Sequence, residues 1–216
     1  MNKLTNREEI FSLLRDGMSI MVGGFLANGT AETVIDYICQ SDVKNLTVIT
    51  NDGAFPDKGV GKLLVSGKVK KLIASHIGTN PYINEKMNCG EMEVVFVPQG
   101  TLAERIRCGG NGLGGFLTLV GLGTIIEEGK EKITVEGKEY LLELPLRADL
   151  AVIGSSVCDE SGNIVYHGTS QNFNPLMAMA ADVVVAEAKE LVKIGSIAKE
   201  SIHVPNILVD KIILTK

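Results

Sequence analysis

An apolar run that breaks into glycines is the part of this sequence best suited to hold a ligand. Ser19–Val22 leads directly into Gly23 and Gly24, and a further glycine follows at Gly29. Glycines at the end of a strand let a bound group approach the main chain closely, because no Cβ stands in the way. A helix that follows such a loop directs unpaired N–H groups at the same place, which favours an anion. The alternative is a tight turn that only lets the helix pack on the strand.

Thr30 is the residue that we expect to cap this helix. It directly precedes a helical pattern over residues 31–39, and a threonine oxygen in that position accepts hydrogen bonds from the first free N–H groups of a helix. The positive end of the helix dipole would then face the glycine loop. Together the loop and the helix predict an anion-binding site at the end of the first strand.

Two uncharged polar side chains follow other predicted strands. Asn51 comes directly after the strand Leu46–Thr50, and Gln99 follows Pro98 at the end of a strand over residues 93–97. In an α/β sheet, ligands bind outside the carboxyl ends of the strands, so we expect both side chains to face the site that the glycine loop forms. A neutral amide donor suits an anionic substrate. The alternative for Gln99 is simple exposure to solvent.

The thiols and imidazoles offer no convincing catalytic or metal site. The histidines (His76, His167 and His203) are isolated, and the cysteines (Cys39, Cys89, Cys108 and Cys158) form no C-x-x-C pair. This spacing predicts no metal centre and reduced thiols. Cys108 lies beside a run of glycines, yet no histidine pattern near it offers a base. The sequence therefore predicts no catalytic nucleophile on this chain.

Residues 110–115 fit the dinucleotide pattern G-x-G-x-x-G letter for letter. That fingerprint follows a strand and opens a helix. Here the glycines follow a helical pattern over residues 102–108 and precede the apolar run of residues 116–120. We therefore expect a flexible turn between two elements, and not a nicotinamide site.

Composition bounds the class of protein. The chain has 216 residues, of which 45% are hydrophobic, and a formal net charge of −5. This length favours a single domain over residues 1–216. The acidic balance argues against nucleic acid as a partner, because neutralising phosphates needs a basic face. There is no basic run for a membrane surface, no membrane-spanning apolar stretch and no signal peptide, so we expect a cytoplasmic protein. No internal repeat is apparent.

Short apolar strands alternate with helical patterns along the chain. The predicted strands are Ser19–Val22, Leu46–Thr50, Val69–Ala74 and residues 93–97, 150–153, 182–186 and 207–209. Continuous apolar strands of this kind predict an α/β fold, with a mostly parallel sheet and helices on both faces. Residues 132–136 and 139–143 alternate around Gly137 and Lys138, which predicts a β-hairpin that projects from the main sheet.

Three stretches resemble the signatures of family I coenzyme A transferases, and together they span residues 16–182. The first consists of Asp16-Gly17, Ile20-Met21-Val22, Gly23-Gly24-Phe25 and Gly29. The second consists of Val97-Pro98-Gln99-Gly100-Thr101-Leu102, Glu104-Arg105-Ile106-Arg107 and Gly109-Gly110. The third is Asn172-Phe173-Asn174-Pro175. The chain resembles the A (alpha) subunits of this family, of the acetate or butyrate:acetoacetate type.

The resemblance implies an activity that this chain performs only with a partner. Family members exchange coenzyme A between carboxylates by a ping-pong route, through a thioester on a glutamate of the B (beta) subunit, in an α2β2 assembly. Coenzyme A thioesters would be substrates, with no tightly bound cofactor. The loop would contact the thioester and stabilise charge on acyl oxygens through backbone donors near Gly23 and Gly24. The residues that the resemblance assigns to the loop are Gly23, Gly24, Phe25, Leu26, Ala27, Asn28 and Gly29.

Two further residues correspond to positions that contact substrate in this family. Gln99 would bind the acyl or carboxylate group, and Asn51 matches an asparagine near the substrate, whereas some relatives have a second asparagine where this chain has Asp52. The implied fold is shared with sugar-phosphate isomerases. An isomerase with its own acid or base on this chain, and a non-catalytic subunit that binds acyl-CoA, are the alternatives.

Overall fold

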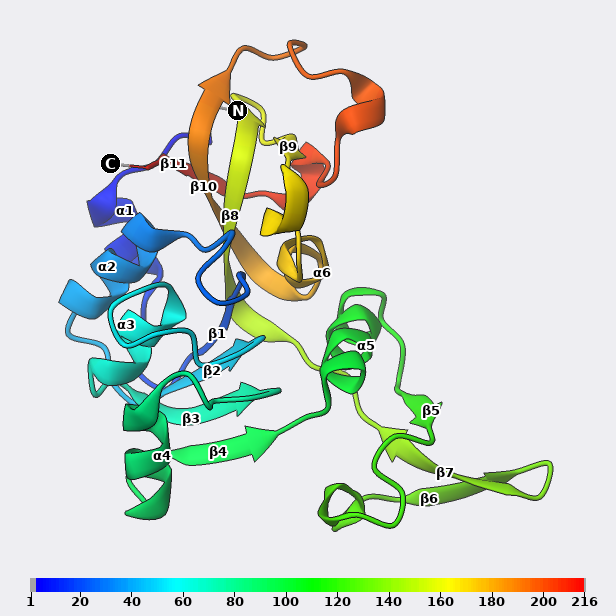
Figure 1. Ribbon diagram of the computed structural model, residues 1–216. Helices are drawn as coiled ribbons and strands as arrows, with labels where there is room; N and C mark the ends of the chain where they lie inside the picture. Colours follow the sequence, from blue (N-terminus) through cyan, green and yellow to red (C-terminus); the bar gives the residue numbers. More distant parts are fainter. Residues whose placement is uncertain (1–2, 216) are drawn as a thin grey trace.

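The computed structural model describes residues 3–215, which build one large sheet and a small projecting one (Figure 1). The large sheet contains β1 (Ser19–Val22), β2 (Leu46–Thr50), β3 (Val69–Ala74), β4 (Glu93–Phe96), β8 (Ala148–Asp159), β9 (Ile164–Val165), β10 (Ala181–Val192) and β11 (Lys211–Leu214). The helices are α1 (Arg7–Leu13), α2 (Glu32–Gln40), α3 (Val60–Val65), α4 (Pro81–Asn88), α5 (Gln99–Gly110) and α6 (Asn174–Met179). Short 3-10 helices are η1 (Ile125–Glu127), η2 (Gly168–Ser170), η3 (Lys199–Ser201) and η4 (Asn206–Leu208).

The large sheet reverses its strand order at β1. The order is β11-β10-β8-β1-β2-β3-β4, and every neighbouring pair along it is parallel. Only β9 is antiparallel, beside β8. The chain leaves β1 toward β2, and it leaves β8 toward β10, in the opposite direction. The carboxyl ends of β1 and β8 therefore form a topological switch point, where α/β sheets open a crevice for ligands.

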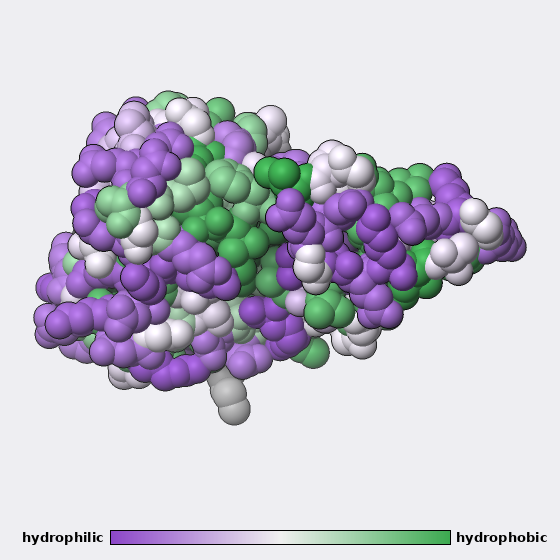
Figure 2. Space-filling view, turned by 90° about the horizontal axis from the view of Figure 1, so that it is seen from below, coloured by the Kyte–Doolittle hydropathy of each residue, from purple (hydrophilic) through white to green (hydrophobic). Residues whose placement is uncertain are grey.

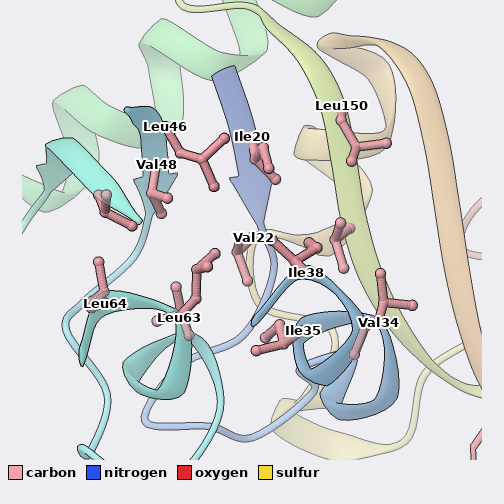
Figure 3. Packing of buried hydrophobic residues seen from close by; sticks show 14 of the residues in the cluster. Ile20, Val22, Val34, Ile35, Ile38, Leu46, Val48, Leu63, Leu64 and Leu150 are labelled. Atoms are coloured by element: carbon pink, nitrogen blue, oxygen red, sulfur yellow. The ribbon is translucent and has the colours of Figure 1, made fainter. Parts of the chain in front are cut away.

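Helices cover both faces of the sheet, as the sequence predicts. On one face Ile20 and Val22 of β1 pack with Ile35 and Ile38 of α2 (Figure 3). On the other face Met21 lies in a second cluster, which includes Leu102 of α5 and Met177 of α6. A strand buried on both faces has to be apolar at every position, which explains the uninterrupted run Ile20-Met21-Val22.

The projecting sheet contains the predicted hairpin and one strand more. Strand β5 (Phe116–Thr118) pairs with β7 (Lys138–Glu143), which pairs with β6 (Lys132–Val135). Val135 lies opposite Lys138, so the turn residues are Glu136 and Gly137, one position earlier than predicted. Both have positive φ, 50° and 76°, as a two-residue turn of this hand requires. The sheet extends from the end of α5 away from the body (Figure 1).

The predicted strand over residues 207–209 is wrong. Residues Asn206–Leu208 form the 3-10 helix η4, and Ile207 is 84% exposed. The last strand begins at Lys211. Within residues 3–215, no helix has the length and apolar character needed to cross a membrane.

Candidate functional site

A pocket opens at the carboxyl edge of the sheet, where the sequence predicts a ligand. Its volume is about 370 Å³, and its lining residues are Phe25, Asn51, Gln99, Thr169, Asn172 and Phe173. Phe25 comes from the loop after β1, Asn51 from the end of β2 and Gln99 from the start of α5. The remaining three come from the η2–α6 segment. The structure therefore brings together the two predicted amide side chains and one residue of the glycine loop.

The loop after β1 ends in a tight and strained turn. Phe25 and Asn28 exchange two backbone hydrogen bonds, of 3.0 and 2.9 Å, across Leu26 and Ala27. Leu26 and Ala27 have φ of 48° and 67°, a conformation that glycine, asparagine or aspartate usually supplies. Holding two residues with ordinary side chains there costs free energy that the surrounding structure has to offset. The turn presents Phe25 and Leu26 to solvent, with 40% and 37% of their surfaces exposed.

A series of hydrogen bonds fixes Gly24 through both its N–H and its carbonyl. The Gln99 side chain donates to Asn51 Oδ1, and Asn51 Nδ2 donates to the Gly24 carbonyl over 3.2 Å. On the opposite side the Gly24 N–H donates to Asn172 Oδ1 over 3.0 Å. Residues at the end of β2, in α5 and in the segment before α6 therefore hold both peptide groups that flank the Gly24 Cα. The prediction that Asn51 and Gln99 face the same site is correct.

Two asparagines of the third signature brace the loop. Asn172 Nδ2 donates to the Asn28 carbonyl over 3.1 Å, and Asn174 Nδ2 donates to the Gly29 carbonyl over 3.0 Å. A Cβ at Gly23 would collide with Asn174 Oδ1. A Cβ at Gly24 would collide with the Thr30 hydroxyl, and the φ of Gly24 is 127°. Both glycines are therefore required by close packing within the chain.

The backbone N–H groups of Gly23 and Gly24 are not free to bind a ligand, contrary to the prediction. The N–H of Gly23 donates to the Val152 carbonyl over 2.9 Å, and that of Gly24 is held by Asn172. The donors expected at these two positions are thus engaged within the chain.

The predicted helix cap is also wrong. Helix α2 begins at Glu32, its N-cap is Ala31, and no side chain caps it at that position. The buried carboxylate of Glu187 accepts from the Val34 N–H over 3.0 Å instead. Burial raises the pKa of Glu187. The positive end of α2 is therefore satisfied by the protein's own carboxylate, which comes from β10 and could not be recognised from the local sequence.

The donors that remain in the pocket are side-chain amides. Each amide carries two N–H bonds, and the hydrogen bonds of the described residues use one on Asn51 and one on Gln99. Thr169 adds a hydroxyl, which accepts from Asn28 Nδ2. Phe25 and Phe173 supply aromatic walls. Such a lining can bind an uncharged acyl group or a carboxylate through neutral donors.

The described lining contains no group able to form a thioester with coenzyme A. None of the six residues that define the pocket in the described structure is a carboxylate, thiol or imidazole. Cys108 is completely buried. His76 lies nearby, with its ring centroid 6.1 Å from that of Phe25. Across residues 3–215, no cluster of three or more His, Cys, Asp or Glu side chains is arranged to hold a metal ion.

Sequence reasoning assigned no role in the site to three of the lining residues. Thr169, Asn172 and Phe173 reach the pocket from a segment far along the chain. The third signature contains Asn172 and Phe173, so the resemblance carried a signal for two of them. No periodicity or strand-end pattern marks Thr169.

Comparison with known proteins identifies relatives that match almost the whole chain. The chain is 51% identical over 214 residues to the acetate CoA-transferase subunit alpha of Escherichia coli K12, with 99% of this chain and 97% of that protein covered. It is 52% identical over 212 residues to the acetoacetyl-CoA:acetate/butyrate CoA transferase alpha subunit of Clostridium acetobutylicum, with 98% and 97% covered.

Solved structures share the fold. An acyl-CoA transferase of Escherichia coli O157:H7, solved as a thioester complex with CoA, superposes with a TM-score of 0.88 at 21% identity over 99% of this chain. The chain spans only 47% of that protein's length. Glutaconate coenzyme A-transferase of Acidaminococcus fermentans superposes with a TM-score of 0.86 at 15% identity, covering 99% of this chain and 75% of that one.

The family profile described as Coenzyme A transferase matches residues 5–215. This range contains all three signatures, both amides and the glycine loop. Neither the isomerase nor the non-catalytic alternative is favoured by these relatives, which are named as transferase subunits. A pocket of neutral amides without a nucleophile, on a fold shared with solved CoA transferases, agrees with the sequence match: the chain belongs to the coenzyme A transferase family.

Proposed function

We propose that this chain is the A (alpha) subunit of a short-chain acyl-CoA:carboxylate CoA-transferase that uses acetate or butyrate and acetoacetate. The partner is a B (beta) subunit, and the assembly is α2β2. The reaction is ping-pong. A glutamate of the B subunit takes coenzyme A from the acyl-CoA as a thioester and releases the free carboxylate, and the same thioester then passes coenzyme A to the incoming carboxylate.

The observation that carries this proposal is a pocket whose lining can bind a substrate but lacks a group that could form the covalent intermediate. Its described lining has amides, a hydroxyl and two phenyl rings, with no group able to form a thioester. A transferase that works through a covalent intermediate needs such a group from elsewhere. A glutamate of the partner would complete the site, and the two most similar relatives described above are alpha subunits by name.

Each group of this chain then has a defined task. The unused N–H bonds of Asn51 and Gln99 bind the acyl or carboxylate oxygens and orient them toward the incoming glutamate. Because these donors are neutral, they do not form an ion pair with the nucleophilic carboxylate. Fixed donors of this kind stabilise negative charge as it develops on oxygen. Gly23, Gly24 and the loop residues 25–29 contact the coenzyme A thioester, with Phe25 against the acyl group.

Further features of the protein belong to the same proposal. Residues 1–216 form a single domain, supported by one sheet that contains both the early strand β1 and the last strand β11. Coenzyme A thioesters are substrates, and no cofactor is tightly bound. We propose a cytoplasmic enzyme without nucleic-acid or membrane partners, supported by the net charge of −5.

Reconstitution tests the proposal. The purified chain alone, a B subunit alone and the co-expressed pair are assayed for transfer of coenzyme A from acetoacetyl-CoA to acetate and butyrate. We expect activity only from the pair. Turnover by this chain alone, or a pair that is inactive with both carboxylates, would contradict the assignment.

A further inference from the structure

A short repeat lies in the two loops that follow β1 and β2. Gly23, Phe25 and Gly29 recur 30 positions later as Gly53, Phe55 and Gly59. Only these loop residues recur, so the similarity is too short to stand out as a repeat of whole elements. In both copies a strand ends, a glycine and a phenylalanine follow, and a second glycine precedes a helix.

The two copies fold in closely related ways. Phe55 pairs with Lys58 in an antiparallel bridge, as Phe25 pairs with Asn28. Both phenylalanines are exposed to a similar extent, 40% for Phe25 and 38% for Phe55. The strained residues differ, since Leu26 and Ala27 have positive φ in the first loop and Ala54, with a φ of 45°, does in the second.

One buried carboxylate joins the two loops. Asp52 is 2% exposed; its Oδ2 accepts from the Leu26 N–H over 3.1 Å, and its Oδ1 accepts from the Ala54 N–H over 2.7 Å. Each oxygen thus holds a residue with left-handed backbone. The loops also touch directly, because a Cβ at Gly59 would lie 2.9 Å from the Ala27 Cβ. The Gly59 N–H donates to Glu32 Oε1 over 2.7 Å, which ties the second loop to α2.

We propose that Asp52 is a positioning residue that sets the shape of the acyl pocket. Its carboxylate holds the strained tip of the first loop and ties it to the second. It thereby fixes Phe25, which forms one wall of the pocket, and so contributes to the choice between a short and a longer acyl chain. This inference rests on the proposed function, in which the pocket receives the acyl group.

The carboxylate is needed because both of its oxygens accept from N–H groups. An asparagine side chain has one oxygen and one NH2 group. Because the two amides bond to different oxygens of Asp52, the single oxygen of asparagine can serve only one of them. The Ala54 N–H is only two residues away in the chain, so we expect it to retain its hydrogen bond to the single oxygen of asparagine. The Leu26 N–H would then face another donor, and the left-handed conformation of Leu26 would lose its support. Phe25, the preceding residue, would move.

The test is carried out on the complex of this chain with its B subunit. Wild type, Asp52→Asn and Asp52→Asn/Leu26→Gly are compared by the ratio of kcat/KM for acetate and butyrate. We expect Asp52→Asn to change this ratio about tenfold, which corresponds to about 1.4 kcal/mol of differential transition-state binding. Glycine adopts positive φ without support, so the ratio of the double variant should return part of the way from the Asp52→Asn value toward the wild-type value.

Asp159→Asn is the matched control. Asp159 is also 2% exposed, and its Oδ1 accepts from the main chain of Ser161, Gly162 and Asn163, in a turn after β8. This variant should lower the unfolding temperature and leave the acyl ratio unchanged. A similar ratio change in Asp159→Asn would show that general destabilisation is sufficient and would overturn the inference.

The remaining outcomes separate the inference from the proposed function. An active wild-type complex with an unchanged ratio in Asp52→Asn overturns the role of Asp52 alone. A wild-type complex without transferase activity overturns the proposed function, and the inference with it. If Asp52→Asn does not fold, the rate of hydrogen exchange of the Leu26 amide in the wild-type complex tests whether Asp52 holds the first loop. Slow exchange supports the bond to buried Asp52, and exchange as fast as that of the exposed hairpin turn at Glu136 and Gly137 contradicts it.

Discussion

At the scale of single residues, the site depends on neutral amides held in series. Gln99, Asn51, Gly24 and Asn172 are connected by hydrogen bonds that start at α5 and end before α6. Each amide in such a series fixes the orientation of the next, so the unused N–H bonds of Asn51 and Gln99 have defined directions. A defined direction is what a substrate oxygen needs for productive alignment.

Gly24→Val should abolish turnover of the complex. Valine at this position would meet the Thr30 hydroxyl and would have to adopt a φ of 127°, which L residues rarely do. The loop would shift and carry Phe25 with it. Gly67→Val is the control, because Gly67 also has positive φ but has open space around it. We expect Gly67→Val to lose only the stability that a positive φ costs and to keep its kcat, and Gly24→Val to lose more stability and its kcat; a near-normal kcat in a folded Gly24→Val complex would make the loop purely structural.

Gln99→Ala should slow acyl transfer and still allow the covalent intermediate to form. Removing one neutral hydrogen bond costs about 0.5 to 1.5 kcal/mol, which lowers kcat/KM by a modest factor. Single-turnover kinetics with acyl-CoA would follow thioester formation and transfer separately. Gln40→Ala, at the exposed end of α2, serves as control. Complete failure of Gln99→Ala to form the intermediate would assign Gln99 a different role.

The sequence predicted the residues that end strands and missed those that arrive from elsewhere. Asn51 and Gln99 follow apolar strands directly, and strand ends in a parallel sheet meet at one edge. Thr169 reaches the same pocket from the short 3-10 helix η2, which no periodic pattern predicts. The capping role expected for Thr30 failed for a similar reason, since Glu187 occupies the start of α2 from a distant strand.

At the scale of elements, a predicted strand is present where its apolar run is buried inside the large sheet. Strands β1, β2 and β3 have the predicted bounds. β1 is apolar from Ile20 to Val22 because both of its faces are covered, whereas β3 is fully buried only in its second half, Leu72–Ala74, after the exposed Lys70. The run over residues 207–209 is equally apolar but follows Pro205; Ile207 and Leu208 lie in η4, where Ile207 is 84% exposed, and the buried Val209 follows it outside any strand. A three-residue apolar run does not reveal whether other elements cover it, so the local sequence pattern could not distinguish the 3-10 helix η4 from a buried strand.

Asp149 should make stability depend on pH at the junction of β1 and β8. Its Oδ2 accepts from the Ser19 N–H over 2.7 Å, and its Oδ1 pairs with Arg15. The Ser19 N–H holds the pKa of Asp149 below its ordinary value of 3.8. A lowered pKa in the folded state means that the stabilisation is present above the ordinary value and is lost as pH falls through the folded one.

Asp149→Asn should therefore cost about 1.5 to 3 kcal/mol of unfolding free energy at neutral pH, as expected for a hydrogen bond to a charged group. Denaturant unfolding of this chain and the variant, measured from pH 7 downward, would determine the difference. The difference should shrink as the pH drops below 4. A difference that is independent of pH would show that Asp149 contributes through shape and not through its charge.

At the scale of the whole molecule, the chain presents an open binding surface beside a projecting sheet. Hydrophobic residues gather where the body meets this sheet, with hydrophilic residues around them (Figure 2). Ile125 of η1 and Val120 after β5 are 80% and 50% exposed. The sequence predicted the hairpin but not β5, because a three-residue strand is too short to display alternation.

The location of the covalent thioester tests the account most directly. The complex is incubated with acetoacetyl-CoA without an acceptor carboxylate, and intact mass spectrometry is used to weigh both chains. We predict that the B subunit gains the mass of coenzyme A with loss of water, on a glutamate that peptide mapping identifies, and that this chain keeps its unmodified mass. A coenzyme A adduct on any residue of this chain, Cys108 included, would contradict the account.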